Sequence, residues 1–278
     1  MKHDNRIHRK TLIVSIVLIA FAIVFMAPII WMFNISLLKR ADVFKVPLVW
    51  FPFPLQWANY WKAMTSTPFF QYFANTLFIS VLSIVGEILS CSLVAFSFSR
   101  LRWKGRDALF LVVLATMMLP KSMTMIPVFV IFSHLHLINT YVPLVLPHFF
   151  GFPFYIFLMR QFFIGMPKSM DEAARIDGCG VLTIYARIIM PLSKPVIGIV
   201  AIQVFRDVWN DFINPLLYLN DIKKWTLTLW LQSFQQDFTV DWTQLMSASV
   251  ITTVPVLLLF FMAQKYFMQD IVFTGVKE

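Results

Sequence analysis

Long apolar segments alternate with short polar ones along most of the chain. A segment of roughly 17 to 25 apolar residues is long enough to cross a bilayer as a helix. Backbone groups inside lipid must be hydrogen-bonded within the segment, which favours helices over irregular structure. The pattern therefore predicts an all-α, polytopic membrane protein with about six transmembrane helices. The predicted spans are residues 11–33, 75–99, 108–132, 142–163, 195–217 and 244–266.

Two of these segments carry features that qualify the prediction. The first follows a basic head and contains Ala20-Phe21-Ala22, which resembles the cleavage site of a secretion signal. The apolar run continues to Phe33, so we expect a retained anchor. In the third segment Pro120 precedes Lys121. A proline disfavours helix at the residue before it, so we expect this span to be broken there.

The composition agrees with a lipid environment. Apolar residues make up 59% of the 278 residues and charged residues 13%, against about 25% charged residues in soluble domains. A soluble domain of this length has too few polar residues here to cover its surface. Cys91 and Cys179 are not in a metal-binding spacing, so neither a zinc site nor a disulfide framework is expected.

The net charge of +9 has a topological explanation. Of the 23 Lys and Arg residues, 15 fall in the segments 1–10, 100–107, 160–194 and 265–278, which share one side if the N-terminus is inside. Only six fall in the opposite loops. This is the positive-inside bias. It predicts a multi-pass membrane protein with both termini cytoplasmic, and it removes the reason to expect nucleic acid as a partner.

The fifth predicted span carries a polar stripe. At 100° per residue its members cover an arc of roughly 140° if the helix is continuous. Polar groups are costly inside a bilayer, so this face should meet the helical bundle or a water-filled path. Lining of a translocation path and an interface with a second membrane subunit both remain open. The members are Gln203, Arg206, Asp207, Asn210, Asp211 and Asn214.

Other polar residues in the spans are more isolated. The second span carries Ser80, Ser83 and Ser90, and small hydroxyl residues at such spacing favour helix packing. Glu87 on the same stripe is expected to pair with a basic group. Lys121 is a candidate partner for Glu87 or for Asp207, and the sequence alone does not choose between them.

The predicted inner segment between the fourth and fifth spans has strong local signals. Ser169 followed by Glu172 fits a capping box at the start of a helix. Gly178 is a suitable stop for that helix. Residues 181–190 then support a second helix, closed by Pro191. The segment thus predicts a short helix, a turn and another helix on the cytoplasmic side.

This segment also resembles a known family. The run Glu172-Ala173-Ala174, followed by Gly178, Ile188 and Met190-Pro191, resembles the EAA loop of ABC importer permeases, whose pattern is EAA-x3-G-x9-I-x-LP. Met190 departs from the preferred leucine, a volume-conserving change. Residues 137–140, 209–216 and 264–277 resemble the carbohydrate branch of these permeases, in particular the smaller membrane subunit of maltose-type importers.

The resemblance implies a type I ABC importer permease fold and a transport mechanism. It implies that the EAA loop is a coupling helix seated on a partner ATPase, with Glu172, Ala173, Ala174, Asp177 and Gly178 as its main residues. Ile188 and Pro191 complete the motif. The implied partners are a second homologous permease, an ABC ATPase dimer, an extracytoplasmic solute-binding protein and a sugar substrate.

The implied cofactors belong to other chains. The sequence has no G-x-x-x-x-G-K-[ST] phosphate loop, so ATP and Mg are expected on the partner ATPase and not on this chain. We therefore expect that this chain is not an enzyme. The expected organisation is a cytoplasmic tail (1–10), an anchor with an outer loop (11–74), a permease core (75–266) with the EAA loop at 167–191, and a second tail (267–278).

Two other classes of membrane protein are alternatives to the permease. An ion-coupled secondary transporter also carries acids and bases inside the membrane, but it needs no EAA loop and typically has repeated halves, which are not detectable here. A membrane enzyme would have to use His134, His136 and His148. Histidines two residues apart do not share a helical face, and no HExxH motif accompanies them. The sequence favours the permease.

Overall fold

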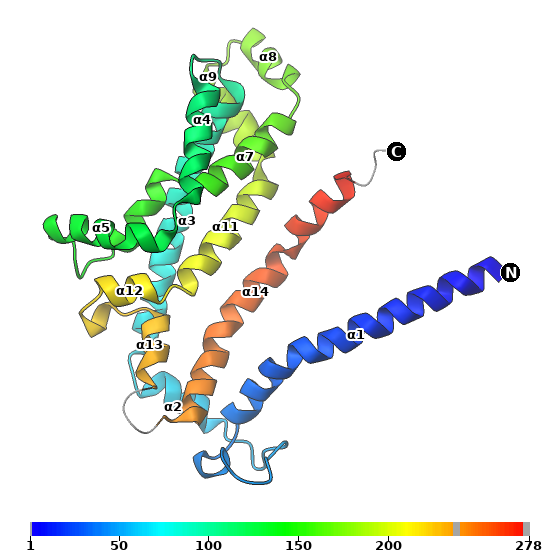
Figure 1. Cartoon of the computed structure of the whole chain (residues 1–278), viewed down its shortest axis with the longest axis vertical. Helices are drawn as coiled ribbons and strands as arrows, with labels where there is room; N and C mark the ends of the chain where they lie inside the picture. The colour runs from blue at the N-terminus through cyan, green and yellow to red at the C-terminus, as the bar shows by residue number, and fades with distance from the viewer. Residues whose placement is uncertain (1, 236–239, 275–278) are drawn as a thin grey trace. The chain divides into compact units, whose positions relative to one another are not determined.

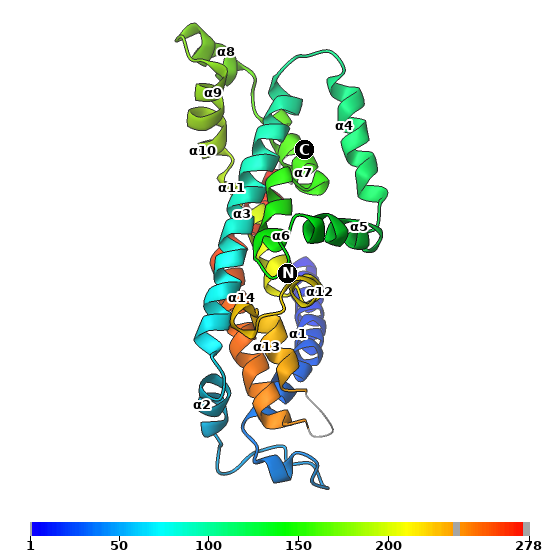
Figure 2. The same ribbon diagram turned by 90° about the vertical axis from the view of Figure 1, so that its left-hand side faces the viewer.

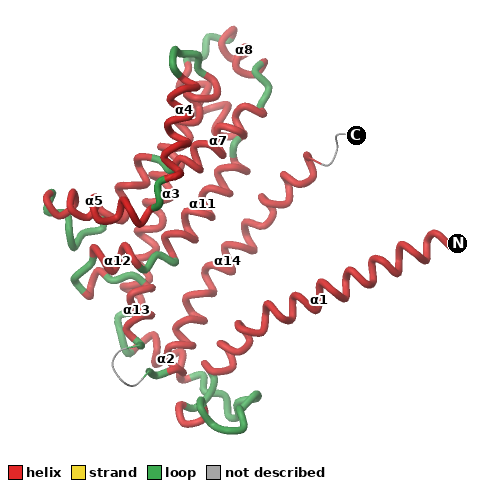
Figure 3. Tube along the Cα trace, in the orientation of Figure 1, coloured by secondary structure: helices red, strands yellow, loops and turns green. Residues whose placement is uncertain are grey.

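The computed structural model describes residues 2–235 and 240–274, in which every regular element is helical (Figures 1 and 3). The predicted all-α class is confirmed for this part of the chain. The chain divides into two compact units, residues 1–69 with 231–254 and residues 70–230 with 255–278. Of the two predicted tails, Met1 and residues 275–278 lie outside the described residues.

Four of the six predicted spans correspond to single helices of sufficient length. Thr11–Ser36, Phe69–Arg100, Val142–Gly165 and Trp242–Met262 each qualify as a single crossing. Two further candidates are bent pairs. Arg106–Met118 and Lys121–His134 meet at 96°, and Val181–Leu192 and Lys194–Trp209 meet at 77°. The described chain therefore has four to six candidate spans, and the predicted six are reached if each bent pair crosses once.

The predicted break at Pro120 is present. Helix α4 (Arg106–Ala115) continues into the short helix η2 (Thr116–Met118), and α5 (Lys121–His134) begins directly after the proline. Leu119 and Pro120 between them have extended backbone angles. The ring of a proline clashes with a helical conformation at the preceding residue, which accounts for the sharp turn.

The prediction of one continuous helix over 195–217 is wrong. Helix α11 (Lys194–Trp209) ends at Trp209, and α12 (Ile213–Tyr218) begins after a short irregular segment. Pro215 has no amide to donate to the carbonyl four residues earlier, that of Asp211. The Thr228 hydroxyl donates to that carbonyl instead, at 2.7 Å. The proline and this side-chain contact stabilise the break.

The first unit contains α1 (Lys2–Ser36), η1 (Arg40–Asp42), α2 (Ala58–Thr65) and the start of α14 (Trp242–Thr274). Side chains of α2 form hydrogen bonds with the C-terminal end of α1. Ser36 Oγ lies 2.6 Å from the Tyr60 hydroxyl, and the Asn59 amide donates to the Ser36 carbonyl at 2.9 Å. The span of α1 itself exposes its apolar side chains, as expected for a helix that faces lipid.

The second unit is built around α3 (Phe69–Arg100), and Figure 2 shows this helix running beside α7 (Pro153–Gly165). Its main core joins α3 to α7 and α11 through fully buried residues such as Ala95, Met159, Phe163 and Val200. A second apolar cluster includes Ile79 and Tyr218. The other elements are α6 (Val142–Val145), η3 (Leu146–Phe150), η5 (Ile222–Lys224) and α13 (Leu227–Ser233).

Candidate functional site

The segment that resembles the EAA loop begins with helix α8 (Ser169–Ile176), which lies at the Arg100 end of α3 (Figure 1). The residue before the helix is Lys168, and no side chain caps the first turn. The predicted capping box is therefore wrong, because Ser169 lies inside the first turn, one position too late to act as its cap.

The other end of α8 agrees with the prediction. Gly178 has a φ of +80°, the left-handed conformation that glycine adopts without strain. The Gly178 amide donates to the Arg175 carbonyl at 3.0 Å, and the Cys179 amide donates to the Ala174 carbonyl at 2.9 Å. These two bonds form a Schellman motif, which satisfies carbonyls that the helix end leaves free.

The two sides of α8 differ in exposure. Asp171 and Ala174, three residues apart on one face, are buried against the rest of the unit. The opposite side is exposed. We call it the outer face of α8, defined by the predicted coupling residues Glu172, Ala173, Asp177 and Gly178, and the exposed side chain of Ile176 lies among them. Of the predicted coupling residues on α8, Ala174 points inward, where it belongs to the main core. The outer face therefore combines two carboxylates and small residues with one exposed apolar side chain.

After the glycine turn the chain forms α9 (Val181–Ile184), a π-helical turn η4 (Tyr185–Ile189) and α10 (Met190–Leu192). Ile188 is half-buried against the main core. Pro191 is exposed and does not close the helix, which continues to Leu192. A proline withholds its amide from the carbonyl four residues earlier, which fits a π turn just before it.

A buried ion pair connects α8 to α3. Arg100 Nη1 lies 3.1 Å from Asp171 Oδ2, and the two side chains are 3% and 11% exposed. Arg100 Nη2 also donates to the carbonyls of Phe163 at 2.6 Å and Met166 at 3.1 Å, at the end of α7. In the sequence, Arg100 stands out only as one of the inner basic residues. Its partners are 63 to 71 residues away, so no local pattern could reveal them.

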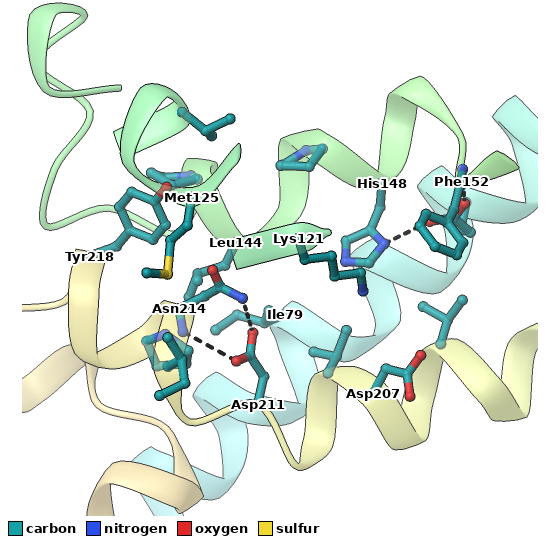
Figure 4. A pocket seen from close by; sticks show the side chains of 18 of the residues that line it. Ile79, Lys121, Met125, Leu144, His148, Phe152, Asp207, Asp211, Asn214 and Tyr218 are labelled. Atoms are coloured by element: carbon teal, nitrogen blue, oxygen red, sulfur yellow. Dashed lines mark hydrogen bonds and ion pairs between the residues drawn. The ribbon is translucent and has the colours of Figure 1, made fainter. Parts of the chain in front are cut away.

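The second candidate site is a cavity of about 600 Å³ in the same unit (Figure 4). Its wall comes from α3, α5, α6, η3, α7, α11 and α12. Apolar residues such as Ile79, Met125 and Tyr218 form much of the lining. Polar groups converge on the remainder, namely Glu87, Lys121, Ser122, Thr124, His148, Tyr155, Asp207, Asp211 and Asn214. Such a mixed lining is typical of a small-molecule site.

The predicted polar stripe divides at the end of α11. Asp207, Asp211 and Asn214 line the cavity, and Figure 4 shows Asp207 and Asp211 side by side along one wall. Gln203, Arg206 and Asn210 are not part of the lining. The helix stops at Trp209, so residues after it no longer follow the 100° rotation. Asp211 instead accepts the side-chain amide of Asn214 at 2.7 Å.

Glu87 is the most buried acidic residue of the cavity wall, at 1% exposure. Its Oε2 lies 2.7 Å from His148 Nδ1, and its Oε1 accepts the Phe152 amide and the Cys91 thiol. The expectation of a basic partner holds, with His148 as that partner in place of Lys121. Burial of a carboxylate is tolerated when several donors satisfy it. This carboxylate thus fixes the chain between η3 and α7.

Lys121 takes neither of its predicted partners. Its ammonium lies over the Phe152 ring, 5.0 Å from the centroid, a cation–π contact. Asp207 pairs with the adjacent Arg206 at 2.9 Å and accepts the Tyr155 hydroxyl at 3.3 Å. In Figure 4, Lys121 and His148 extend from one side of the cavity toward the wall that carries Asp207 and Asp211. The cavity therefore presents groups of both charges.

Comparison with known proteins decides between the alternatives. The family described as binding-protein-dependent transport system inner membrane component matches residues 88–272. The chain belongs to this family. It is 34% identical over 209 residues to AraQ of Halalkalibacterium halodurans, an arabinooligosaccharides transport system permease protein, with 75% of each chain covered. It is 29% identical to DasC of Streptomyces coelicolor, a diacetylchitobiose uptake system permease protein, with 91% of each covered.

A solved structure agrees with this family membership. The crystal structure of a bacterial ABC transporter involved in the import of the acidic polysaccharide alginate contains a similar chain. Its TM-score is 0.83 at 25% identity, covering 92% of the present chain and 95% of that chain. The predicted ABC importer permease fold is confirmed. The chain is a multi-pass inner-membrane permease subunit of an ABC importer, which displaces the secondary-transporter and enzyme alternatives.

Proposed function

We propose that this permease moves a sugar or oligosaccharide across the bacterial cytoplasmic membrane by alternating access, driven by a partner ATPase. Two curated relatives are named for the uptake of arabinooligosaccharides and of diacetylchitobiose. The observation that carries the proposal is the outer face of α8. It is an exposed surface with two carboxylates, small residues and the apolar side chain of Ile176, on a helix whose other side is anchored in the core.

The outer face suits contact with a partner protein. Glu172 offers a charge to a basic groove, and Ala173 leaves room for close approach of the partner backbone. The Gly178 turn lets the chain leave α8 at an angle. In this proposal α8 faces the cytoplasm, as do both termini, in line with the distribution of Lys and Arg residues. ATP and Mg are held by the ATPase dimer, since this chain has no phosphate loop.

The cavity is the proposed contribution of this chain to the substrate path. Sugar hydroxyls that leave water need hydrogen-bonding partners. Asp207, Asp211 and Asn214 on one wall and Lys121 on the other supply acceptors and donors. In this proposal the second homologous permease completes the path, and a solute-binding protein delivers the sugar from outside.

The test is to isolate the tagged chain in mild detergent from the host that makes its partners. We expect an ABC ATPase and a second permease to be recovered with it. Glu172→Lys reverses the charge on the outer face, and we expect loss of the ATPase and of sugar uptake, with normal amounts of the chain in the membrane. Normal uptake by this variant would contradict the coupling role of α8.

Asp107→Lys provides a matched control. Asp107 is also an acidic residue outside the predicted spans, with a side chain 73% exposed, but it lies at the start of α4 and not on α8. Its carboxylate pairs with Arg106 and Arg160 but stays open to water, which screens such pairs, so they contribute little to stability. We expect this variant to retain the ATPase and uptake. Equal losses in both variants would point to a general effect of charge on this side of the protein.

A further inference from the structure

We propose that Arg100 is a positioning residue that transmits movement of α8 to the two helices α3 and α7 of the cavity wall. The inference rests on the proposed function, because it assumes that an ATPase moves α8. We call the contact of Arg100 with Asp171, Phe163 and Met166 the Arg100 joint. The joint brings the end of α3, the end of α7 and the inner face of α8 to a single guanidinium group.

The geometry of the joint suits transmission. A guanidinium is planar and offers donors in a fixed fork, so it can hold three partners in one orientation. Here one arm binds the carboxylate on α8 and the other arm binds two carbonyls at the end of α7. Cationic groups also interact favourably with the C-terminal ends of helices. A lysine at this position would provide the charge without the fork.

Burial makes the joint difficult to break. Arg100 and Asp171 are 3% and 11% exposed in their side chains. The buried Asp171 Oδ1 and Arg100 Nε make no hydrogen bond with a described residue. Removal of one partner would leave the other as an uncompensated buried charge, which is strongly unfavourable. Movement of α8 away from Arg100 is disfavoured for the same reason.

The other end of α8 is held differently. Gly178 and Gly180 lie in the turn after the helix, and a Cβ added at either would meet no atom within 4 Å. The Schellman bonds connect this turn to α8 itself, and Cys179 within it packs against the main core. Against the rest of the unit, the inner face of α8 contributes Ala174 and Asp171. Of these two, the acidic residue reaches α3 through an ion pair.

The two helices at the joint lead to the cavity. Arg100 and Glu87 belong to the same helix α3, 13 residues apart, which is roughly 20 Å at the rise of an α-helix. Glu87 in turn binds the Phe152 amide just before α7, and Tyr155 of α7 lines the cavity. A displacement of α8 that moves Arg100 therefore acts on both α3 and α7, which contribute residues to the cavity wall. The cavity and the ATPase side are connected through rigid helices.

The test measures whether ATP still changes the cavity. A cysteine at Thr124, an exposed lining residue, is labelled with a membrane-impermeant maleimide in the complete detergent-purified importer. Labelling is compared without nucleotide and with ATP plus vanadate, after subtraction of the signal from Cys91 and Cys179. With Arg100 present we expect ATP to change the labelling rate about tenfold, a size typical of coupled sites.

Arg100→Gln and Asp171→Asn are expected to reduce this change to less than about twofold, through loss of the coupling. The recovered ATPase and its basal ATP hydrolysis should stay near wild type, because the outer face is intact. Arg100→Lys, which keeps the charge and should fold, is expected to be intermediate. The double variant should be no worse than either single one, because residues that act as one unit are not additive.

Arg160→Gln is the matched control. Arg160 also donates to a backbone carbonyl, that of Phe98, its guanidinium lies over the Phe110 ring, and it pairs with Asp107 at 3.9 Å, and none of these described partners belongs to α8. It should retain the ATP-dependent labelling. Wild-type labelling changes in both Arg100 variants would overturn the inference. If the wild-type chain recovers no ATPase at all, the proposed function fails instead, so the two failures are distinguishable.

Discussion

The outer face of α8 and the cavity are assembled in opposite ways within the same unit. The outer face is one short stretch of chain, and its residues are exposed and share few contacts. The cavity draws its polar groups from helices far apart in the sequence, and most of these groups are already bonded to one another. A local exposed site is sensitive to single changes that leave the fold intact. In a site whose residues come from several helices and bond to one another, a substitution changes both the function and the stability of the fold.

The largest expected effect concerns the cavity, at its most buried acidic residue. Glu87→Ala removes a carboxylate with three bonded partners and leaves His148 and the Phe152 amide without an acceptor. We expect a loss of about 3–5 kcal/mol in stability, the range for breaking a buried charged pair. Thermal unfolding of the purified chain in detergent measures it. Glu87→Gln should cost less, because it keeps an oxygen acceptor.

The control for that measurement is Glu172→Ala, which removes a carboxylate of the exposed outer face. Its unfolding temperature should match wild type, since substitutions of exposed residues change stability by about 0.5 kcal/mol or less. Equal unfolding temperatures for Glu87→Ala and wild type would show that the Glu87 contacts contribute little. The distinction between the two sites would then fail.

Local patterns account for much of α8 and for little of the cavity. Gly178 identifies the end of α8, and Pro120 identifies the break between α4 and α5, because both act on the backbone around them. The pairs Arg100–Asp171 and Glu87–His148 depend on how distant helices pack, which no local pattern describes. A single sequence offers candidate charges there but not their partners.

The fifth predicted span shows a different kind of miss. The apolar run predicts one long helix over 195–217, but the chain leaves the helix after Trp209. A local signal was present in Pro215, which leaves the Asp211 carbonyl without its helical donor. The hydroxyl that takes its place comes from Thr228. The proline marked a break, while the replacement contact required the folded structure.

A second prediction uses neighbouring alanines on α8. Ala174 is 5% exposed and belongs to the main core, whereas Ala173 lies on the outer face. Ala174→Leu should lower stability by about 1–3 kcal/mol, because it overpacks the core. Ala173→Leu should leave unfolding unchanged but reduce recovery of the partner ATPase. Thermal unfolding and co-purification of both variants measure the two effects. Equal unfolding temperatures and equal ATPase recovery in both variants would contradict the distinction between the inner and outer faces of α8.

A third, smaller effect concerns the turn after α8. Gly178→Ala has space for its methyl group but must adopt a φ of +80°, which costs a residue with a Cβ about 1–2 kcal/mol. We expect a modest fall in the unfolding temperature and weaker recovery of the ATPase. Gly180 has a φ of −70° and equally open space, so Gly180→Ala is the control and should be neutral. A neutral Gly178→Ala would show that the left-handed turn is not required.

The smallest effect separates two asparagines of the former stripe. Asn214 lines the cavity and donates to Asp211, whereas Asn210 lies outside the lining and donates to the Arg206 carbonyl of its own helix. Asn214→Ala removes the side-chain hydrogen bond to the Asp211 carboxylate, but this bond is exposed and the Asn214 backbone amide still donates to the same carboxylate, so the net loss should be about 1 kcal/mol or roughly fivefold at most. We therefore expect uptake of the transported sugar to fall about threefold. Asn210→Ala should leave uptake unchanged. A larger loss of uptake for Asn210→Ala would indicate that the substrate path follows Asn210 and not the cavity lined by Asn214. The assignment of the substrate path to the cavity would then be wrong.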